Sequence, residues 1–255
     1  MAAGSALAQE RPWTPLPSPV SATCPGGLCQ PQGLTEFFAA LDRGGPVRIA
    51  QFGDSHTAGG HITESLLWRL RAGFPGRDVD LTAEGVVGDT LRGLSSREPL
   101  LAPDAPVPDL VILAYGTNEG FDDLLDPVAY ERLLREQIGR VRALVPRASI
   151  LILGAPEAMR GEGGGTCPAD PERRWKPPAM LGVVRDVQHR VAAQTGVAFW
   201  DWKGRMGGDC SAHALTLGDA PMMRGDHVHF TGAGGDWIGS LLFADLMAAR
   251  GRGGR

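Results

Sequence analysis

The sequence of 255 residues lacks the features that mark several common classes of protein. It contains no run of about 18 apolar residues, so no segment is long enough to cross a membrane as a helix. It also contains no block of like charges, and its net charge is −4. A protein that binds nucleic acid usually carries a basic stripe, so this class is not expected. The only lysines are Lys176 and Lys203, and arginine supplies the rest of the positive charge.

Glycine and proline, in contrast, are abundant, with 36 and 20 residues. Their combined share stays below the roughly 25–30% that is typical of low-complexity disordered chains. A chain of this length with 43% hydrophobic residues can bury a substantial core. These values predict a loop-rich globular protein with one large or two small domains.

The sequence contains four cysteines, Cys24, Cys29, Cys167 and Cys210. Whether they form disulfides depends on the redox state of the compartment in which the protein resides. Their spacing does not match the CxxC pairs of a structural zinc site. We expect two disulfides, Cys24–Cys29 and Cys167–Cys210. Four free thiols are the alternative.

The first residues resemble the end of a secretory leader. Ala6-Leu7-Ala8 has the small-x-small pattern of a cleavage site before Gln9, although the basic start and most of the apolar stretch are missing. We therefore predict a periplasmic or secreted protein, with a cytoplasmic location as the alternative. Residues 1–33 are predicted to be a disordered or extended tail, and residues 34–255 the folded domain.

Short apolar runs alternate with segments of helical periodicity along the rest of the chain. Such runs, when closed by glycine, are typical of buried parallel strands. The predicted strands are Val47–Phe52, Asp78–Leu81, Leu110–Tyr115, Ser149–Leu153 and Val197–Trp202, and the predicted helices are Leu34–Leu41, Ile62–Ala72, Pro127–Leu144, Met180–Gln194 and Trp237–Ala249. The alternation predicts a doubly wound α/β sheet.

Polar residues follow the first three strands, where ligands bind in such sheets. Ser55 lies in the tetrapeptide GDSH after the first strand, Gly88 follows the second, and Asn118 follows the third. A serine on a tight turn suits nucleophilic attack, and an asparagine amide suits an oxyanion hole. Taken alone, Ser55 has an ordinary reading as a helix cap and Asn118 as a turn residue.

A fourth polar segment precedes the last helix. Asp226 lies three residues before His229, so its carboxylate can fold back to accept the Nδ1 proton of the imidazole. The other ring nitrogen then stays free as a base for a serine hydroxyl.

Together, Ser55, Gly88, Asn118 and His229 resemble the four blocks that give the SGNH (GDSL-type) hydrolase superfamily its name. The resemblance covers about residues 47–249. It implies a flavodoxin-like three-layer α/β/α sandwich with a five-stranded parallel sheet. It also implies a triad of Ser55, His229 and Asp226, and an oxyanion hole formed by Ser55, Gly88 and Asn118. No metal or organic cofactor is implied.

Two residues depart from the family pattern. His56 replaces the usual leucine after the nucleophile, and Glu119 replaces the usual aspartate after Asn118. GDSH is similar to the branch that removes O-acetyl groups from bacterial polysaccharides, peptidoglycan above all. The implied partner is an acetylated glycan or a small ester. His56 is expected either to contact substrate or, preferably, to pack behind its loop.

A long insertion, residues 157–176, also bears on the substrate. Long loops in compact domains are often functional. Trp175, with Arg160 and Lys176, is predicted to line a glycan cleft by stacking on sugar faces. The alternative is an insertion without such a role, fixed by Cys167. No role is predicted for three other histidines, His61, His189 and His213.

Several other functions remain open at this point. An O-acetyltransferase would use the same triad, and a lipase or thioesterase would differ in its acyl group. A catalytically silent glycan-binding module is disfavoured because every catalytic position is filled. A metal-dependent phosphoesterase fits less well because Glu119 stands where a histidine ligand is required. Its remaining donors would be Asp54, His56, Asp89, His227 and His229.

Overall fold

The computed structural model describes residues 24–253 and contains a central sheet of six strands. The strands are β1 (Leu28–Cys29), β2 (Val47–Gly53), β3 (Val79–Gly85), β4 (Leu110–Ala114), β5 (Ser149–Leu153) and β6 (Ala198–Trp200). Their spatial order is β1-β6-β5-β4-β2-β3, and all neighbours except β1 and β6 run parallel. The five parallel strands have the flavodoxin order, which confirms the predicted fold class.

The sixth strand corrects the predicted five-stranded sheet. β1 has only two residues, and it pairs antiparallel with β6 between two 3₁₀ turns, Pro25–Gly27 and Pro31–Leu34. Leu28 and Leu34 are buried in the cores, so this segment is part of the folded unit. The predicted tail is therefore wrong for residues 24–33. The predicted leader end and the rest of the tail lie outside the described residues.

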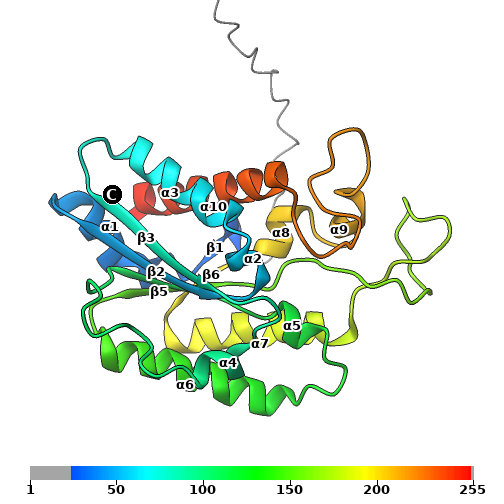
Figure 1. The fold of residues 1–255 in the computed structure, drawn as a ribbon, viewed down its shortest axis with the longest axis horizontal. Helices are drawn as coiled ribbons and strands as arrows, with labels where there is room; N and C mark the ends of the chain where they lie inside the picture. The colour runs from blue at the N-terminus through cyan, green and yellow to red at the C-terminus, as the bar shows by residue number, and fades with distance from the viewer. Residues whose placement is uncertain (1–23, 254–255) are drawn as a thin grey trace, which may run out of the picture.

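Helices cover both faces of the sheet, in three layers (Figure 1). One face carries α1 (Thr35–Arg43), α3 (His61–Gly73) and α10 (Gly232–Gly253), and the other carries α4 (Leu91–Ser95), α6 (Pro127–Leu144) and α7 (Ala179–Thr195). Alternate side chains of a strand point to opposite faces. In β4, Leu110 and Ile112 accordingly join the first core, whereas Val111 and Leu113 join the second.

Four short helices follow strand ends or lie in long loops. They are α2 (Ser55–Ala58), α5 (Thr117–Gly120), α8 (Trp202–Met206) and α9 (Ser211–Ala214). Trp202 begins α8 and so lies outside the strand to which we assigned it. Asp201 ends the extended segment because its side chain accepts a hydrogen bond from the Gly204 N–H and caps the helix.

The insertion of residues 157–176 extends from the body between β5 and α7 (Figure 1). Both predicted disulfides are present, and Cys167–Cys210 joins the insertion to the segment before α9. Two predicted glycan contacts, Arg160 and Lys176, pair with each other through their backbones and share Glu162 as an ion-pair partner.

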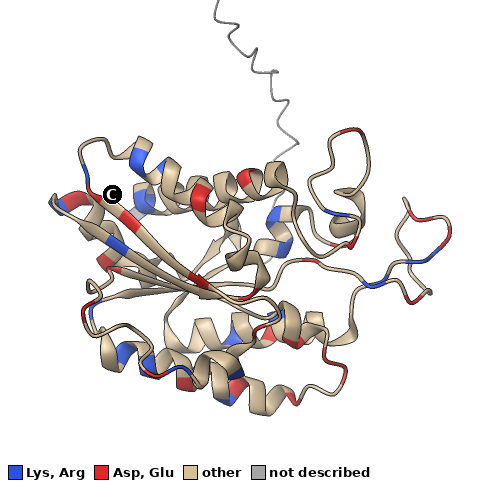
Figure 2. Cartoon of the chain, viewed as in Figure 1, with Lys and Arg blue, Asp and Glu red and all other residues tan. Residues whose placement is uncertain are grey.

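Charged residues are distributed without a dominant sign over the ribbon in Figure 2, where blue and red segments are interspersed. This pattern agrees with the absence of a basic stripe in the sequence. Within residues 24–253, no helix is both long and apolar enough to cross a membrane.

Candidate active site

The candidate residues gather where the strand order of the sheet reverses. β2 lies between β3 and β4, so the chain leaves neighbouring strand ends toward opposite faces. Ser55 follows β2, Gly88 follows β3 and Asn118 follows β4. Gly85 allows the close approach of these loops, because a Cβ there would lie 2.1 Å from the Ala58 nitrogen.

Ser55, His229 and Asp226 form a continuous hydrogen-bonded chain. The Ser55 Oγ lies 2.9 Å from His229 Nε2, and His229 Nδ1 lies 2.8 Å from Asp226 Oδ2. A carboxylate only accepts hydrogen bonds, so Nδ1 carries the proton and Nε2 is free to accept the serine proton. The arrangement can activate a serine hydroxyl as a nucleophile.

The turn that carries Asp226 and His229 fixes their geometry. The second carboxylate oxygen of Asp226 accepts the backbone N–H groups of Val228 and His229, both at 2.9 Å. Partial burial alone would raise the pKa of Asp226. These N–H groups and the His229 ring instead hold the pKa of Asp226 below its usual 3.8, so the carboxylate is charged at neutral pH.

The three residues predicted to form the oxyanion hole, Ser55, Gly88 and Asn118, each have an N–H donor that is not engaged within the described residues. Ser55 is the first residue of α2, so its N–H has no partner within that helix. Gly88 has a φ of +77°, a conformation that favours glycine, and no hydrogen bond of its N–H occurs among residues 24–253. The Asn118 amide nitrogen donates to the Asp89 carbonyl oxygen at 2.7 Å. This bond ties Asn118 to the Gly88 loop and leaves its second N–H available.

Glu119 makes a second link between the same two loops. Its Oε1 accepts the N–H of Leu91 at 2.8 Å, while its Oε2 is buried without a partner. Burial raises the pKa of Glu119 from 4.5 to about 7, although the Leu91 N–H acts in the opposite direction. The residue that departs from the family pattern thus holds the start of α4 against α5.

His56 lies behind Ser55 and joins two loops. Its Nδ1 lies 3.1 Å from Asp54 Oδ1, and its Nε2 lies 2.9 Å from the Val228 carbonyl oxygen. Both partners are acceptors, so both ring nitrogens must carry protons and the imidazole is charged. Burial on its own lowers the pKa of His56. The charge and hydrogen bond of Asp54, with the Val228 carbonyl, outweigh burial and raise it above 6.5.

The position of His56 agrees with packing, the preferred of our two expectations. Its side chain is only 3% exposed, although one edge borders the cavity in front of Ser55. Because Val228 directly precedes His229, His56 anchors the backbone that carries the candidate base.

Trp175, which we predicted to line a glycan cleft, is half-buried beside the Asp226–His229 turn. Its ring stacks on His227 with the centroids 3.5 Å apart, and it packs against the core. His227 also contacts His213, whose Nδ1 lies 3.0 Å from His227 Nε2. The sequence could not show this stack, because its members come from three separate segments. Trp175 therefore connects the insertion with the Asp226–His229 turn.

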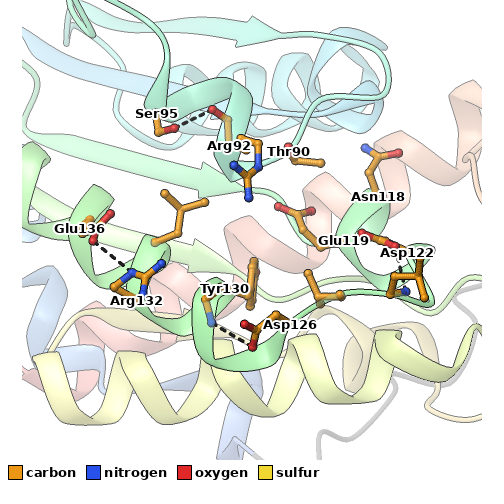
Figure 3. Close-up of a pocket in the computed structure, with 14 residues that line it drawn as sticks. Thr90, Arg92, Ser95, Asn118, Glu119, Asp122, Asp126, Tyr130, Arg132 and Glu136 are labelled. Carbon is orange, nitrogen blue, oxygen red and sulfur yellow. Dashed lines mark hydrogen bonds and ion pairs between the residues drawn. The ribbon is translucent and has the colours of Figure 1, made fainter.

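A cavity of about 310 Å³ lies in front of Ser55 and His229, and we call it the Ser55 cavity. His61 and Arg224 also line it, and no motif in the sequence had indicated a role for either. A larger cavity of about 490 Å³, the Asn118 cavity, lies between α4, α5 and α6. Figure 3 shows the Glu119 side chain between Thr90 and Tyr130 in this second cavity.

The donors of the metal-dependent alternative are engaged elsewhere. Asp89 pairs with Arg97 at 3.1 Å, and His227 contacts the Gly225 carbonyl and His213. Within the described residues, one group places several ligand atoms together for a metal: Cys24, Cys29 and His189. Those cysteines form a disulfide, so they are not available as thiolate ligands.

Solved structures with the same fold include several esterases. A peptidoglycan O-acetylesterase matches with a TM-score of 0.75 and 20% identity, over 88% of this chain and 99% of that chain. An acetylxylan esterase from Geobacillus stearothermophilus matches with a TM-score of 0.60 and 21% identity, over 80% and 95% of the two chains. A two-domain esterase active on acetylated mannans matches with a TM-score of 0.62 and 18% identity, over 88% and 56%.

At these identities the likeness establishes the fold. No curated protein sequence matches the chain. Residues 52–237, however, match the model of the GDSL-like lipase/acylhydrolase family. This match spans most of the chain and contains Ser55, Gly88, Asn118 and the Asp226–His229 turn. The protein therefore belongs to the GDSL-like lipase/acylhydrolase family and is a carboxylic ester hydrolase.

Proposed function

We propose that the protein is a serine esterase that removes O-acetyl groups from a carbohydrate, with peptidoglycan as the first candidate. The observation that carries this proposal is the hydrogen-bonded chain from Ser55 through His229 to Asp226 beside a cavity. Esterase activity needs an activated hydroxyl, an oriented base and space for an ester in front of them. All three requirements are satisfied by residues of this chain.

In the first half of the reaction, the Ser55 oxygen attacks the acetyl carbonyl carbon while its proton moves to His229 Nε2. The tetrahedral intermediate then collapses, the bond to the sugar oxygen breaks, and His229 donates the proton to that leaving oxygen. Asp226 stabilises the charged imidazole between these steps. The acetyl group is now bound to Ser55.

In the second half, His229 takes a proton from water, and the resulting oxygen nucleophile attacks the acetyl-enzyme. Acetate leaves when the proton returns to Ser55. The N–H groups of Ser55 and Gly88 and the Asn118 amide stabilise the oxyanion in both halves. One such donor is typically worth about 2.7–4 kcal/mol in the transition state.

Two observations support an acetylated glycan as the substrate class. The similar structures include a peptidoglycan O-acetylesterase, an acetylxylan esterase and an esterase active on acetylated mannans. The disulfides Cys24–Cys29 and Cys167–Cys210 favour an oxidising compartment, in keeping with a periplasmic or secreted protein.

The test is acetate release from O-acetylated peptidoglycan, compared with acetylated xylan and with p-nitrophenyl esters of increasing acyl length. We expect release from a glycan and a preference for acetyl over longer acyl groups. Ser55→Ala should lose nearly all turnover while remaining folded. Wild-type rates in Ser55→Ala would refute the mechanism, and a preference for long acyl chains would refute the substrate class.

A further inference from the structure

The Ser55 cavity has an unusual charge balance for an acidic protein. None of its lining residues is Asp or Glu, although the chain carries a net charge of −4. The ionisable residues that line it are Arg224 and three histidines, His56, His61 and His229. His61 begins α3, so the positive end of that helix dipole also lies at the cavity wall.

Backbone hydrogen bonds hold the main chain of Arg224 beside that of His229. Its N–H donates to the His229 carbonyl at 2.7 Å, and its own carbonyl accepts the His227 N–H at 3.0 Å. An antiparallel bridge between Met223 and Phe230 closes the same hairpin. The guanidinium is therefore attached to the same small turn as the candidate base.

The guanidinium of Arg224 has no ion pair or hydrogen bond in residues 24–253, and its side chain is exposed. Asp226, two residues away, forms no ion pair with it. Both carboxylate oxygens of Asp226 are engaged by the Val228 and His229 N–H groups and by the His229 ring. A guanidinium is charged at every relevant pH and matches a carboxylate geometrically.

The Asn118 cavity has the opposite charge balance. Four acidic residues line the Asn118 cavity against two arginines (Figure 3). The acids are Glu119, Asp122, Asp126 and Glu136, and the arginines are Arg92 and Arg132. Arg132 is already paired with Glu136 at 3.7 Å. Because burial raises the pKa of Glu119 to about 7, the other three acids carry the steady negative charge of this cavity against two arginines. An anionic group on the substrate is therefore favoured on the Arg224 side, where no acid lines the cavity.

We propose that Arg224 binds a carboxylate of the substrate, so that the preferred ester is an O-acetyl group on an acidic sugar. This inference rests on the proposed esterase function and makes its substrate class more specific. A carboxylate on the same sugar ring as the acetyl group, or on an ether substituent of that ring, is bound by the guanidinium while Ser55 attacks the ester. Uronic acids have this chemistry, and so does muramic acid wherever its lactyl carboxyl carries no peptide.

The experiment measures kcat/KM for three soluble acetyl esters: O-acetylated N-acetylmuramic acid, O-acetylated galacturonic acid and O-acetylated N-acetylglucosamine. We expect an acidic ester to exceed the neutral one by about tenfold, the effect of one charge-assisted hydrogen bond. The ratio should fall as salt rises, because exposed charges are screened. The better of the two acidic esters identifies the source of the carboxylate.

Arg224→Gln should bring the ratio of kcat/KM between acidic and neutral esters to about one, mainly by raising KM for the acidic ester. Arg92→Gln is the matched control, since Arg92 is another exposed arginine beside the site but lines the Asn118 cavity. It should keep the ratio. A wild-type ratio near one, or the same ratio in Arg224→Gln, overturns the inference. If p-nitrophenyl acetate and all three sugars give no Ser55-dependent turnover, the esterase proposal itself fails.

Discussion

Glu119→Gln isolates the effect of one buried carboxyl group on stability. The wild-type side chain is 5% exposed, and its pKa rises from 4.5 in an unfolded chain to about 7 in the fold. Glutamine cannot ionise, but its carbonyl oxygen still accepts the Leu91 N–H. The glutamine amide also buries an NH₂ group that has no acceptor among the described residues. This lowers the free energy of unfolding by an amount that does not change with pH.

The sign follows from proton binding. Between pH 4.5 and about 7 the folded Glu119 keeps a proton that the unfolded chain has lost. The free energy of unfolding therefore falls as pH rises through this window and changes no further above it. At about 1.4 kcal/mol per pH unit, the loss from this group approaches about 3 kcal/mol. The free energy of unfolding of Glu119→Gln, taken relative to wild type, should thus rise by about 3 kcal/mol between pH 4.5 and pH 8.

The measurement is urea unfolding of both proteins at pH 4.5, 6 and 8, followed by tryptophan fluorescence with the disulfides intact. It shows how the difference in free energy of unfolding between the two proteins changes with pH. Other titrating groups cancel because both proteins share them. Glu172→Gln, at an exposed position, is the control and should show no such trend. A Glu119→Gln difference that is independent of pH would refute burial as the cause. A trend of opposite sign would mean that the site stabilises the carboxylate.

Two further predictions concern links between segments. His56→Leu restores the usual family residue but leaves the Asp54 carboxylate buried without its charged partner, so the free energy of unfolding should drop by about 3–5 kcal/mol. kcat for p-nitrophenyl acetate should fall with it, and unchanged stability in urea would contradict a charged pair. Cys210→Ser should cost about 4 kcal/mol and Cys24→Ser only about 2 kcal/mol, because the bridges span 43 and 5 residues. Equal losses in urea would show that loop length is not the cause.

The strands in the middle of the sheet were the most predictable part of the fold. Leu110–Ala114 and Ser149–Leu153 are buried at every position, so they form continuous apolar runs in the sequence. β3 lies at the edge, and most of its residues after Val79 are exposed. Its seven residues include Asp80, Thr82 and Glu84, which hide the strand pattern, and we therefore predicted only its first part.

β1 was not predictable from local sequence. Its two residues are too few for a periodicity, and prolines and glycines surround them. Only the distant partner β6 and the Cys24–Cys29 bridge define it. The stack of Trp175 on His227 was not predictable for a related reason: an aromatic residue in a polar loop suits a sugar platform and a tertiary stack equally well. The choice between them depends on His227, which lies 52 residues later in the chain (227 − 175).

The candidate site, in contrast, was largely predictable because its residues are anchored to strand ends. What the sequence could not show is how the loops are kept together. His56, directly after Ser55, holds the carbonyl of Val228 in the loop of His229. Glu119, directly after Asn118, holds the N–H of Leu91 in the loop of Gly88.

The two positions that depart from the family pattern thus have the same physical role. Each is buried, each adjoins a residue of the candidate site, and each forms a polar link to a loop that carries another. A leucine at residue 56 has no group that can bind the Val228 carbonyl. An aspartate at residue 119 is one methylene shorter, so reaching the Leu91 N–H would require α4 and α5 to move closer together. The departures are therefore coupled to the backbone of this site, and replacing either with the usual residue requires the opposing loop to change as well.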